Sequence, residues 1–192
     1  MIARSLVLLI CFSLTHLMMG AEPFAPKSMT YILQADRLTK TRSNTVEQLA
    51  GCGRDLVVTD HVYTSGTGNE WTAVELATIR QGLVAYISIG EAEDYRSYWN
   101  AQWDANRDGQ PDAGAPAFLN GENPDWEGNY RVRYWGPQWQ TIVLSSVDTI
   151  LQQGLDGIYL DIVDGFETYE YDPKTKDWID HRLNPDTGQT YR

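Results

Sequence analysis

Leu83-Val-Ala-Tyr-Ile-Ser-Ile89 is a short, almost continuous apolar run, and Gly90-Glu-Ala-Glu93 follows it directly. Such a run is typical of a strand that is buried on both faces, as in a parallel sheet. The segments 55–60 and 157–163 have the same form, and each brings a carboxylate to the end of its apolar run. We therefore expect a parallel sheet whose strands end in acids.

Helical segments are predicted between these strands. Residues 70–81 place Leu76 and Ile79 on an apolar side, with Gly82 as the helix stop. Pro137 opens a longer helix that ends at Gly154. Its apolar stripe contains Trp139, Val143, Val147, Ile150 and Leu151.

Three weaker elements complete the pattern: a strand at 29–34, a short helix capped by Asn44 or Thr45, and a short aromatic strand or extended segment at 130–135. The alternation of strand and helix is typical of βαβ units around a parallel sheet. The polar segments 94–130 and 165–192 are predicted to lack regular structure, because they show no clear periodicity.

The first twenty residues are predicted to be a secretory signal peptide. Arg4 precedes the apolar run Ser5-Leu-Val-Leu-Leu-Ile-Cys-Phe-Ser-Leu14, and small residues follow at Gly20 and Ala21. The alternative, a membrane anchor, needs about 20 apolar residues, and this run is shorter. We expect a secreted or periplasmic protein that is free of the membrane after cleavage, with its folded domain at 21–192.

The composition excludes some partners. The net charge is −11, which disfavours nucleic acid and favours cationic ligands. Of the two cysteines, Cys11 lies in the predicted signal peptide, so Cys52 is left without a partner for an internal disulfide. The three histidines are scattered, which gives little support to a histidine metal site or a Ser-His-Asp triad.

Acids at three successive strand ends are the main functional signal. They are Asp60, Glu91 with Glu93, and Asp161 with Asp164. In parallel α/β sheets the active site lies at the carboxyl ends of the strands, where two carboxylates can carry out glycoside hydrolysis. For any single acid the alternative is a helix N-cap or a surface ion pair.

Aromatic residues gather in the polar segments and point to the same chemistry. The set comprises Trp99, Trp103, Trp126, Trp135 and Trp139, with Tyr95, Tyr98 and Tyr134. Flat aromatic faces stack on sugar rings, but they also pack in ordinary cores, and both readings stay open. Trp139 is the exception, because its helical spacing predicts a core position.

One loop has the spacing of calcium ligands. Asp104, Asn106, Asp108 and Asp112 carry side-chain oxygens, and a glycine stands at the sixth position as in calcium loops. Ala115 at the twelfth position excludes an EF-hand. A structural calcium ion and a solvated Asp/Asn turn are both open, and no cofactor is required for catalysis.

Three blocks of the sequence resemble glycoside hydrolase family 114, the endo-α-1,4-polygalactosaminidase family. They are Val84-Ala-Tyr-Ile-Ser-Ile-Gly-Glu-Ala-Glu-Asp-Tyr-Arg-Ser-Tyr-Trp99, Asn123-Pro-Asp-Trp-Glu-Gly-Asn-Tyr-Arg-Val-Arg-Tyr-Trp135 and Gly154-Leu-Asp-Gly-Ile-Tyr-Leu-Asp-Ile-Val-Asp164. The resemblance spans about 29–170 and implies an α/β fold, a (β/α)8 TIM barrel that is truncated here after about four βα units.

The resemblance also assigns roles. Asp161 matches a catalytic carboxylate, the nucleophile by analogy, and the family's other acid lies on a later strand, so Glu91 is the partner expected within this chain. The residues expected to bind substrate are Asp60, Tyr86, Glu93, Arg96, Trp135 and Asp164.

The expected function is a secreted glycoside hydrolase that cleaves an α-1,4-linked galactosamine-type exopolysaccharide with two carboxylates. Its partner would be a cationic amino-sugar polysaccharide, and the resemblance carries this substrate by analogy. The alternatives are a non-catalytic carbohydrate-binding half-barrel and an inactive fragment.

Overall fold

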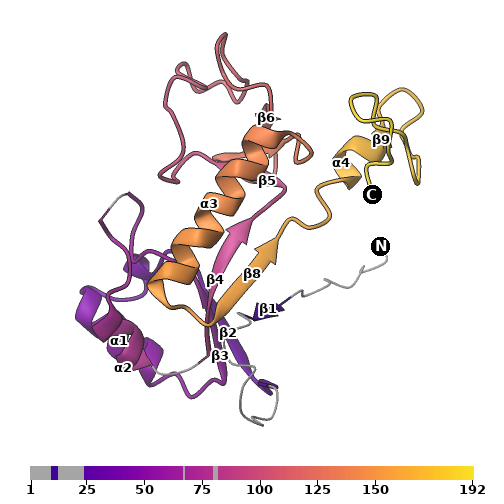
Figure 1. The fold of residues 1–192 in the computed structure, drawn as a ribbon. Coiled ribbons are helices and arrows are strands. Elements are labelled where there is room, and N and C mark those ends of the chain that lie inside the picture. Colours follow the sequence, from indigo (N-terminus) through magenta and orange to yellow (C-terminus); the bar gives the residue numbers. More distant parts are fainter. Residues whose placement is uncertain (1–9, 13–23, 67, 80–81) are drawn as a thin grey trace. The chain divides into compact units, whose positions relative to one another are not determined.

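The computed structural model describes residues 10–12, 24–66, 68–79 and 82–192. They form two compact units (Figure 1). The parallel-sheet unit contains the chain up to Ile87 together with 95–99 and 140–160. The antiparallel-sheet unit contains 88–94, 100–139 and 161–192.

The large sheet has five strands in the order β1-β8-β4-β3-β2. Their bounds are β1 (Ile10–Phe12), β2 (Met29–Ile32), β3 (Leu56–Thr59), β4 (Gly82–Ser88) and β8 (Gly157–Asp161). β2, β3 and β4 pair in parallel, and β1 pairs antiparallel with β8. The arrows of β4 and β8 run in the same direction in Figure 1.

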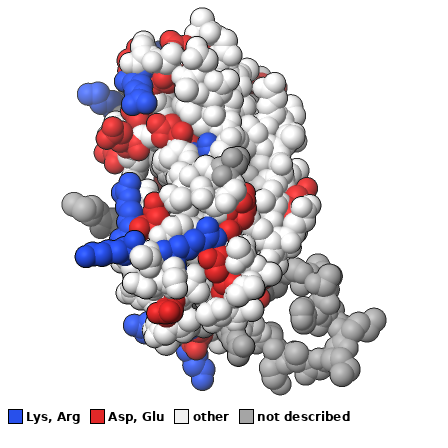
Figure 2. Space-filling view, turned by 90° about the vertical axis from the view of Figure 1, so that its left-hand side faces the viewer, with Lys and Arg blue, Asp and Glu red and all other residues white. Residues whose placement is uncertain are grey.

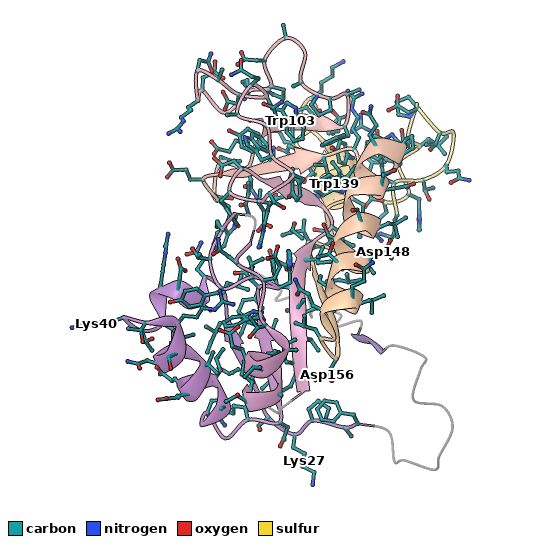
Figure 3. All side chains as sticks on the ribbon, turned by 60° about the vertical axis from the view of Figure 1, so that its left-hand side comes forward. Lys27, Lys40, Trp103, Trp139, Asp148 and Asp156 are labelled. Atoms are coloured by element: carbon teal, nitrogen blue, oxygen red, sulfur yellow. The ribbon has the colours of Figure 1, made fainter. Side chains whose placement is uncertain are left out.

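The start of β8 is fixed to β4 by one aspartate. Asp156, labelled in Figure 3, accepts the Leu83 amide with its carboxylate at 2.8 Å and donates its own amide to the Leu83 carbonyl at 2.9 Å. These two bonds satisfy the backbone amide of Asp156, just before β8, and both backbone polar groups of Leu83 in β4. β8 is the neighbour of β4 in the sheet, as the predicted parallel arrangement requires.

The predicted double burial of the central strands is confirmed. All four residues of β3 are buried, and so are six of the seven residues of β4. One face of the sheet carries a core cluster of Leu56, Val58, Val84, Tyr86 and Tyr159. On the opposite face Val57 and Ala85 are also fully buried, as expected for a parallel sheet with both faces covered.

The three helices that the sequence predicts are present, with corrected ends. α1 spans Arg42–Ala50 after a short 3-10 turn, η2 (Ala35–Arg37). The predicted cap at Asn44 or Thr45 is wrong: Thr41 is the N-cap, because its hydroxyl accepts the Asn44 amide at 3.2 Å.

α2 spans Ala73–Ile79 and is shorter than the predicted segment. Ile79 is buried, as expected, but Gly82 is the first residue of β4 and does not cap the helix. A side chain at Gly82 would overlap the Phe24 ring, with atoms 2.5 Å apart, so close packing explains this glycine.

α3 spans Pro137–Gln153, very close to the predicted bounds. Trp139 and Ile150 are buried, which confirms two members of the apolar stripe. Leu151 is 45% exposed, so the prediction that it belongs to the apolar stripe is wrong. Successive helical residues are separated by about 100°, and Leu151 lies one such step beyond Ile150.

The antiparallel-sheet unit replaces the loop predicted for 94–130. Its sheet has the order β5-β7-β6, with β5 at Glu91–Glu93, β6 at Leu119–Glu122 and β7 at Asn129–Val132. Only short stretches of this segment pair, which explains why it shows no periodicity. Phe118, Tyr130 and Trp139 are buried in this unit.

The C-terminal segment is also more ordered than its composition predicts. It forms α4 (Glu167–Glu170) and a hairpin of β9 (Tyr171–Asp172) and β10 (Asp177–Trp178). Glu170 is 1% exposed and accepts hydrogen bonds from Arg192 at 3.0 Å and from the His181 amide at 3.1 Å. Polar contacts hold this segment, and apolar periodicity is therefore absent.

The predicted signal peptide falls almost entirely outside the described residues, since only Ile10–Phe12 of it are placed, in β1. In the described part of the chain no helix has both the length and the hydropathy that a membrane span needs. Among the described residues, Cys52 forms no disulfide.

Candidate active site

Glu91, the first residue of β5, is a buried carboxylic acid in the antiparallel-sheet unit. It is 4% exposed. Its two oxygens accept hydrogen bonds from the side-chain amides of Asn123, at 2.7 Å, and Asn129, at 3.4 Å. Burial raises the pKa of Glu91 above its ordinary value, although the two amides favour the ionised form. A buried acid with a raised pKa is suited to donate a proton near neutral pH.

The antiparallel pairing explains how Glu91 is held. Glu91 stands opposite Arg131 and Glu93 stands opposite Asn129 in the β5–β7 ladder. Glu93 is 3% exposed, so it is part of the interior of this unit. The sequence identified both acids but missed the two asparagines, although Asn123 begins one of the quoted blocks.

Asp161, the last residue of β8, is linked to the segment that leads into Glu91. The Ile89 amide donates a 3.0 Å hydrogen bond to the Asp161 carbonyl. A side chain at Gly90 would come within 2.4 Å of the Ile162 carbonyl oxygen, so the two backbones are in close contact. The structure thus brings the two predicted catalytic segments side by side.

The backbone after Asp161 is strained. Ile162 has a φ of 53°, a conformation that is unusual for a β-branched residue. Strain of this kind is concentrated at functional sites, where the surrounding structure holds it. Asp164, two residues later, is exposed.

Trp135 belongs to an aromatic group in the same unit. Tyr134, Tyr169 and Tyr191 lie 5.1, 4.8 and 5.3 Å from its ring. Its indole N–H donates to Asp186 at 3.1 Å. The C-terminal segment therefore contacts the Trp135 side chain, which is one of the residues expected to bind substrate.

In the parallel-sheet unit, Asp60 and Arg96 form a mostly buried ion pair. Their side chains are 7% and 13% exposed, and the N–O distance is 2.7 Å. Asp60 also accepts a 2.8 Å hydrogen bond from the backbone amide of Gln34. The Arg96 guanidinium lies 5.6 Å from the Tyr86 ring centroid and 5.1 Å from that of Tyr95. The structure brings together three predicted substrate-binding residues, Asp60, Tyr86 and Arg96.

His61 follows Asp60 and was not singled out from the sequence. Burial, with the nearby Arg96 charge, lowers the pKa of His61 below its ordinary value. Its Nδ1 atom is buried and has no hydrogen-bond partner among the described residues. A sequence signal did exist, since His61 directly follows an acid at a strand end.

The predicted calcium ligands bind the loop's own backbone. The Asp104 carboxylate accepts hydrogen bonds from the Gly109 backbone amide at 3.0 Å and from the Tyr130 hydroxyl at 2.6 Å. The Asp112 carboxylate accepts one from the Ala105 backbone amide at 2.7 Å. These hydrogen bonds outweigh burial and hold the pKa of Asp104 below its ordinary value.

Asn106 and Asp108 complete the same loop. The Asn106 side chain accepts a hydrogen bond from the Asp108 backbone amide, and the Asp108 side chain accepts one from the Gln110 backbone amide. Within the described ranges, no group of three or more His, Cys, Asp or Glu side chains could hold a metal. Calcium binding stays a prediction, and the described loop is an aspartate-capped turn.

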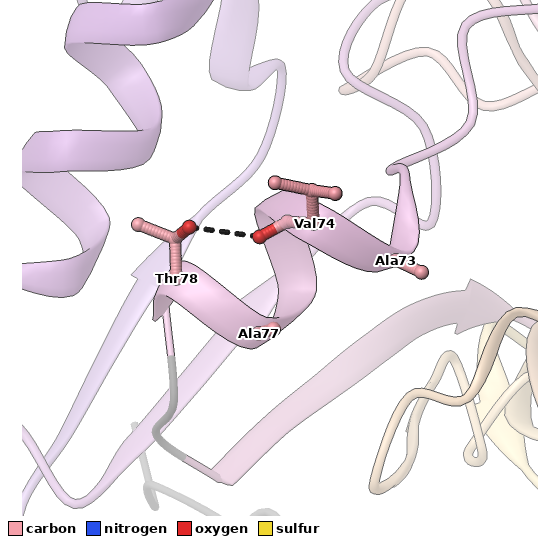
Figure 4. Close-up of a pocket in the computed structure, with 4 residues that line it drawn as sticks. All are labelled: Ala73, Val74, Ala77 and Thr78. Carbon is pink, nitrogen blue, oxygen red and sulfur yellow. Dashed lines mark hydrogen bonds between the residues drawn. The ribbon is translucent and has the colours of Figure 1, made fainter.

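A surface pocket lies on α2, lined by Ala73, Val74, Ala77 and Thr78 (Figure 4). Its only side-chain polar group is the Thr78 hydroxyl, which donates to the Val74 carbonyl at 2.8 Å. This pocket carries no acid, base or nucleophile beyond that hydroxyl, so the strand-end carboxylates are the better candidates.

Comparison with known proteins decides the family. A family model described as glycoside-hydrolase family GH114 matches residues 21–181. The chain belongs to this family. Glycoside hydrolase family 114 is thus the family that the three sequence blocks resemble.

Curated relatives extend well beyond this chain. An uncharacterized protein of Deinococcus radiodurans is 43% identical over 121 residues, which are 62% of this chain and 36% of that protein. An uncharacterized protein of Methanocaldococcus jannaschii is 36% identical over 159 residues, 73% of this chain and 44% of that protein. The chain therefore spans less than half the length of these relatives.

Two solved structures show the fold. A variant of the glycoside hydrolase domain of PelA from Pseudomonas aeruginosa is 16% identical with a TM-score of 0.50, over 74% of this chain and 47% of that one. Aspergillus fumigatus Ega3, in complex with galactosamine, is 17% identical with a TM-score of 0.50, over 77% and 48%. The predicted α/β fold, with the parallel sheet of these TIM-barrel neighbours, is confirmed.

Proposed function

We propose that this member of family 114 is a secreted glycoside hydrolase that cleaves an α-1,4-linked, galactosamine-type exopolysaccharide. Family membership supports hydrolysis of glycosidic bonds. The observation that carries the mechanism is Glu91, a buried acid with a raised pKa on the segment that Ile89 connects to Asp161.

The two carboxyl groups would divide the work between them. Glu91, whose pKa is raised by burial, donates a proton to the leaving oxygen. Asp161 attacks the anomeric carbon and forms a glycosyl-enzyme bond, which water then hydrolyses with Glu91 as the base. This retaining course needs the two carboxyl groups about 5 Å apart, and a wider pair would favour inversion.

The substrate class rests on charge. An amino sugar without its acetyl group is a cation, and the chain has a net charge of −11. On the face drawn in Figure 2, acidic and basic side chains are interspersed. We therefore expect individual carboxylates to bind the ammonium groups, with the exposed Asp164 as the candidate. Ega3, solved with galactosamine, supports the same class of sugar.

The first experiment is hydrolysis of partly deacetylated polygalactosamine by the 192-residue chain and by a version extended with any downstream coding sequence. New reducing ends with the short chain would support the pair Asp161 and Glu91. Activity in the extended version alone would mean that the proton donor lies elsewhere. Binding without cleavage by both versions would contradict the enzyme and favour a carbohydrate-binding protein.

A further inference from the structure

The turn between β6 and β7 presents a tryptophan to solvent. Trp126 is 65% exposed, and Asp125 and Glu127 on either side of it are also exposed. The Trp126 indole makes no hydrogen bond or ring contact with any residue that the structure describes. By contrast, the buried Trp139 donates its indole N–H to the Ile89 carbonyl at 2.8 Å, deep among the side chains shown in Figure 3.

Hydrogen bonds fix the backbone of the turn that carries Trp126. The Trp126 amide donates to the Asn123 carbonyl at 3.1 Å, and the Asn129 amide donates to the Trp126 carbonyl at 3.1 Å. The Asn123 side chain also accepts the Asp125 amide at 3.1 Å, as in an Asx turn. Gly128, with a φ of 82°, supplies the left-handed residue that the second turn needs.

The same turn is attached to the candidate proton donor. Asn123 and Asn129, which close the turn around Trp126, are the two residues whose side-chain amides bind Glu91. The Gly128 amide is bound by the Glu122 carboxylate at 2.6 Å. The backbone that carries the exposed indole is thus linked to Glu91 through Asn123 and Asn129, at the two ends of the turn.

We propose that Trp126 is a sugar-binding subsite, at which its indole face stacks on one ring of the amino-sugar polymer. Asp125 and Glu127 would lie beside the ammonium group of that ring. An indole face attracts a cation, and the attraction at an exposed site is modest. This inference rests on the proposed function, because it takes its substrate class from there.

The test is equilibrium binding of soluble, partly deacetylated galactosamine oligomers to the full chain carrying Asp161→Asn, which prevents cleavage. Adding Trp126→Ala should weaken binding about fivefold, and Trp126→Phe should restore most of it. Trp178→Ala is the matched control, because Trp178 is 57% exposed in the same unit. It should leave binding unchanged.

The inference is overturned if Trp126→Ala binds as tightly as its parent, or if Trp178→Ala weakens binding equally. The contribution of the Asp125 and Glu127 charges to binding is tested by comparing two oligomers. Asp125→Asn with Glu127→Gln should weaken binding of the deacetylated oligomer and spare the fully N-acetylated one. Equal weakening of both oligomers would remove the ammonium contact.

This inference and the proposed function fail separately. If the parent enzyme does not hydrolyse the polymer but Trp126→Ala still weakens binding, the subsite stands and the hydrolase is contradicted. If hydrolysis occurs and binding is unaffected by Trp126→Ala, only the subsite is lost.

Discussion

The Ile89 amide donates a 3.0 Å hydrogen bond to the Asp161 carbonyl, which joins the segment after β4 to the end of β8. Glu91 lies two residues beyond Ile89. Residues separated by about 70 positions in the sequence are therefore neighbours, and the two acids assigned to catalysis are on adjoining backbone segments.

Asp161→Asn is predicted to reduce polymer hydrolysis at least about a thousandfold, because an amide cannot form the glycosyl-enzyme bond. Binding of the same polymer should change little. The measurement is the rate of reducing-end release, with binding measured in parallel. Asp164→Asn is the control, since Asp164 is exposed on the same segment and should cost much less. Retained turnover in Asp161→Asn would remove Asp161 from the catalytic role.

The pH dependence should reveal Glu91. Because burial raises the pKa of Glu91, the acid stays protonated to a higher pH than an ordinary glutamate, whose pKa is about 4.3. The alkaline fall in kcat/KM should therefore be shifted to higher pH. Asn123→Ala removes a donor that favours the ionised form, so the alkaline limb should move further up. Asn120→Ala, which removes an amide bound to the Tyr169 hydroxyl, should leave the limb in place. An unmoved limb in Asn123→Ala would exclude Glu91 as the titrating acid.

Stability should respond to the same group. A raised folded pKa makes a contribution that is complete below the unfolded pKa of about 4.3 and is lost as pH rises through the folded value. The free energy of unfolding of the parent should therefore decline over that window. Glu91→Gln, which does not titrate, should flatten this part of the profile in urea titrations. A profile of identical slope in both proteins would contradict the assignment.

Gly90→Ala should destabilise the protein by about 1–3 kcal/mol, since the added carbon would lie 2.4 Å from the Ile162 carbonyl oxygen and must displace backbone. Activity should fall as well, because Ile162 follows Asp161. Thermal unfolding and turnover would be measured together. The control is Gly51→Ala, whose nearest contact is 3.3 Å. Equal stability of the two variants would argue against the close approach.

Arg96→Ala should lower the free energy of unfolding by about 3–5 kcal/mol, because it leaves the buried Asp60 carboxylate without its ion-pair partner. Arg42→Ala is the comparison, since its pair with Glu75 is more exposed at 29% and 19% and should contribute less. Denaturant unfolding gives both values. If adding Asp60→Asn to Arg96→Ala does not restore the free energy of unfolding, the unpaired Asp60 charge is not the cause of the loss.

Asp104→Ala should cost about 1–3 kcal/mol, because the buried Tyr130 hydroxyl and the Gly109 amide lose their acceptor. Melting temperatures with calcium and with a chelator then separate the two interpretations of this loop. A loop held by its own hydrogen bonds predicts the same melting temperature in both. A rise with calcium, absent in Asp104→Ala, would establish the ion.

Much of the fold could be predicted because burial leaves a direct mark on sequence. β3 and β4 are continuous apolar runs since both faces of the parallel sheet are covered, and α3 shows its start and stop in Pro137 and Gly154. The segment predicted at 130–135 overlaps β7, but β5, β6 and the C-terminal hairpin were missed, because strands of two to four residues held by polar contacts leave no period to detect.

By itself the sequence determined the family, the parallel strands and the acids at their ends, since these depend on local patterning and on short blocks of contiguous residues. Only the tertiary structure decided which groups those acids meet. The asparagines on Glu91, the arginine on Asp60 and the hydroxyl on Asp104 each come from 26 to 38 positions away. Burial and distant hydrogen-bond partners set the pKa of Glu91 and of Asp104, and both arise only when the chain has folded.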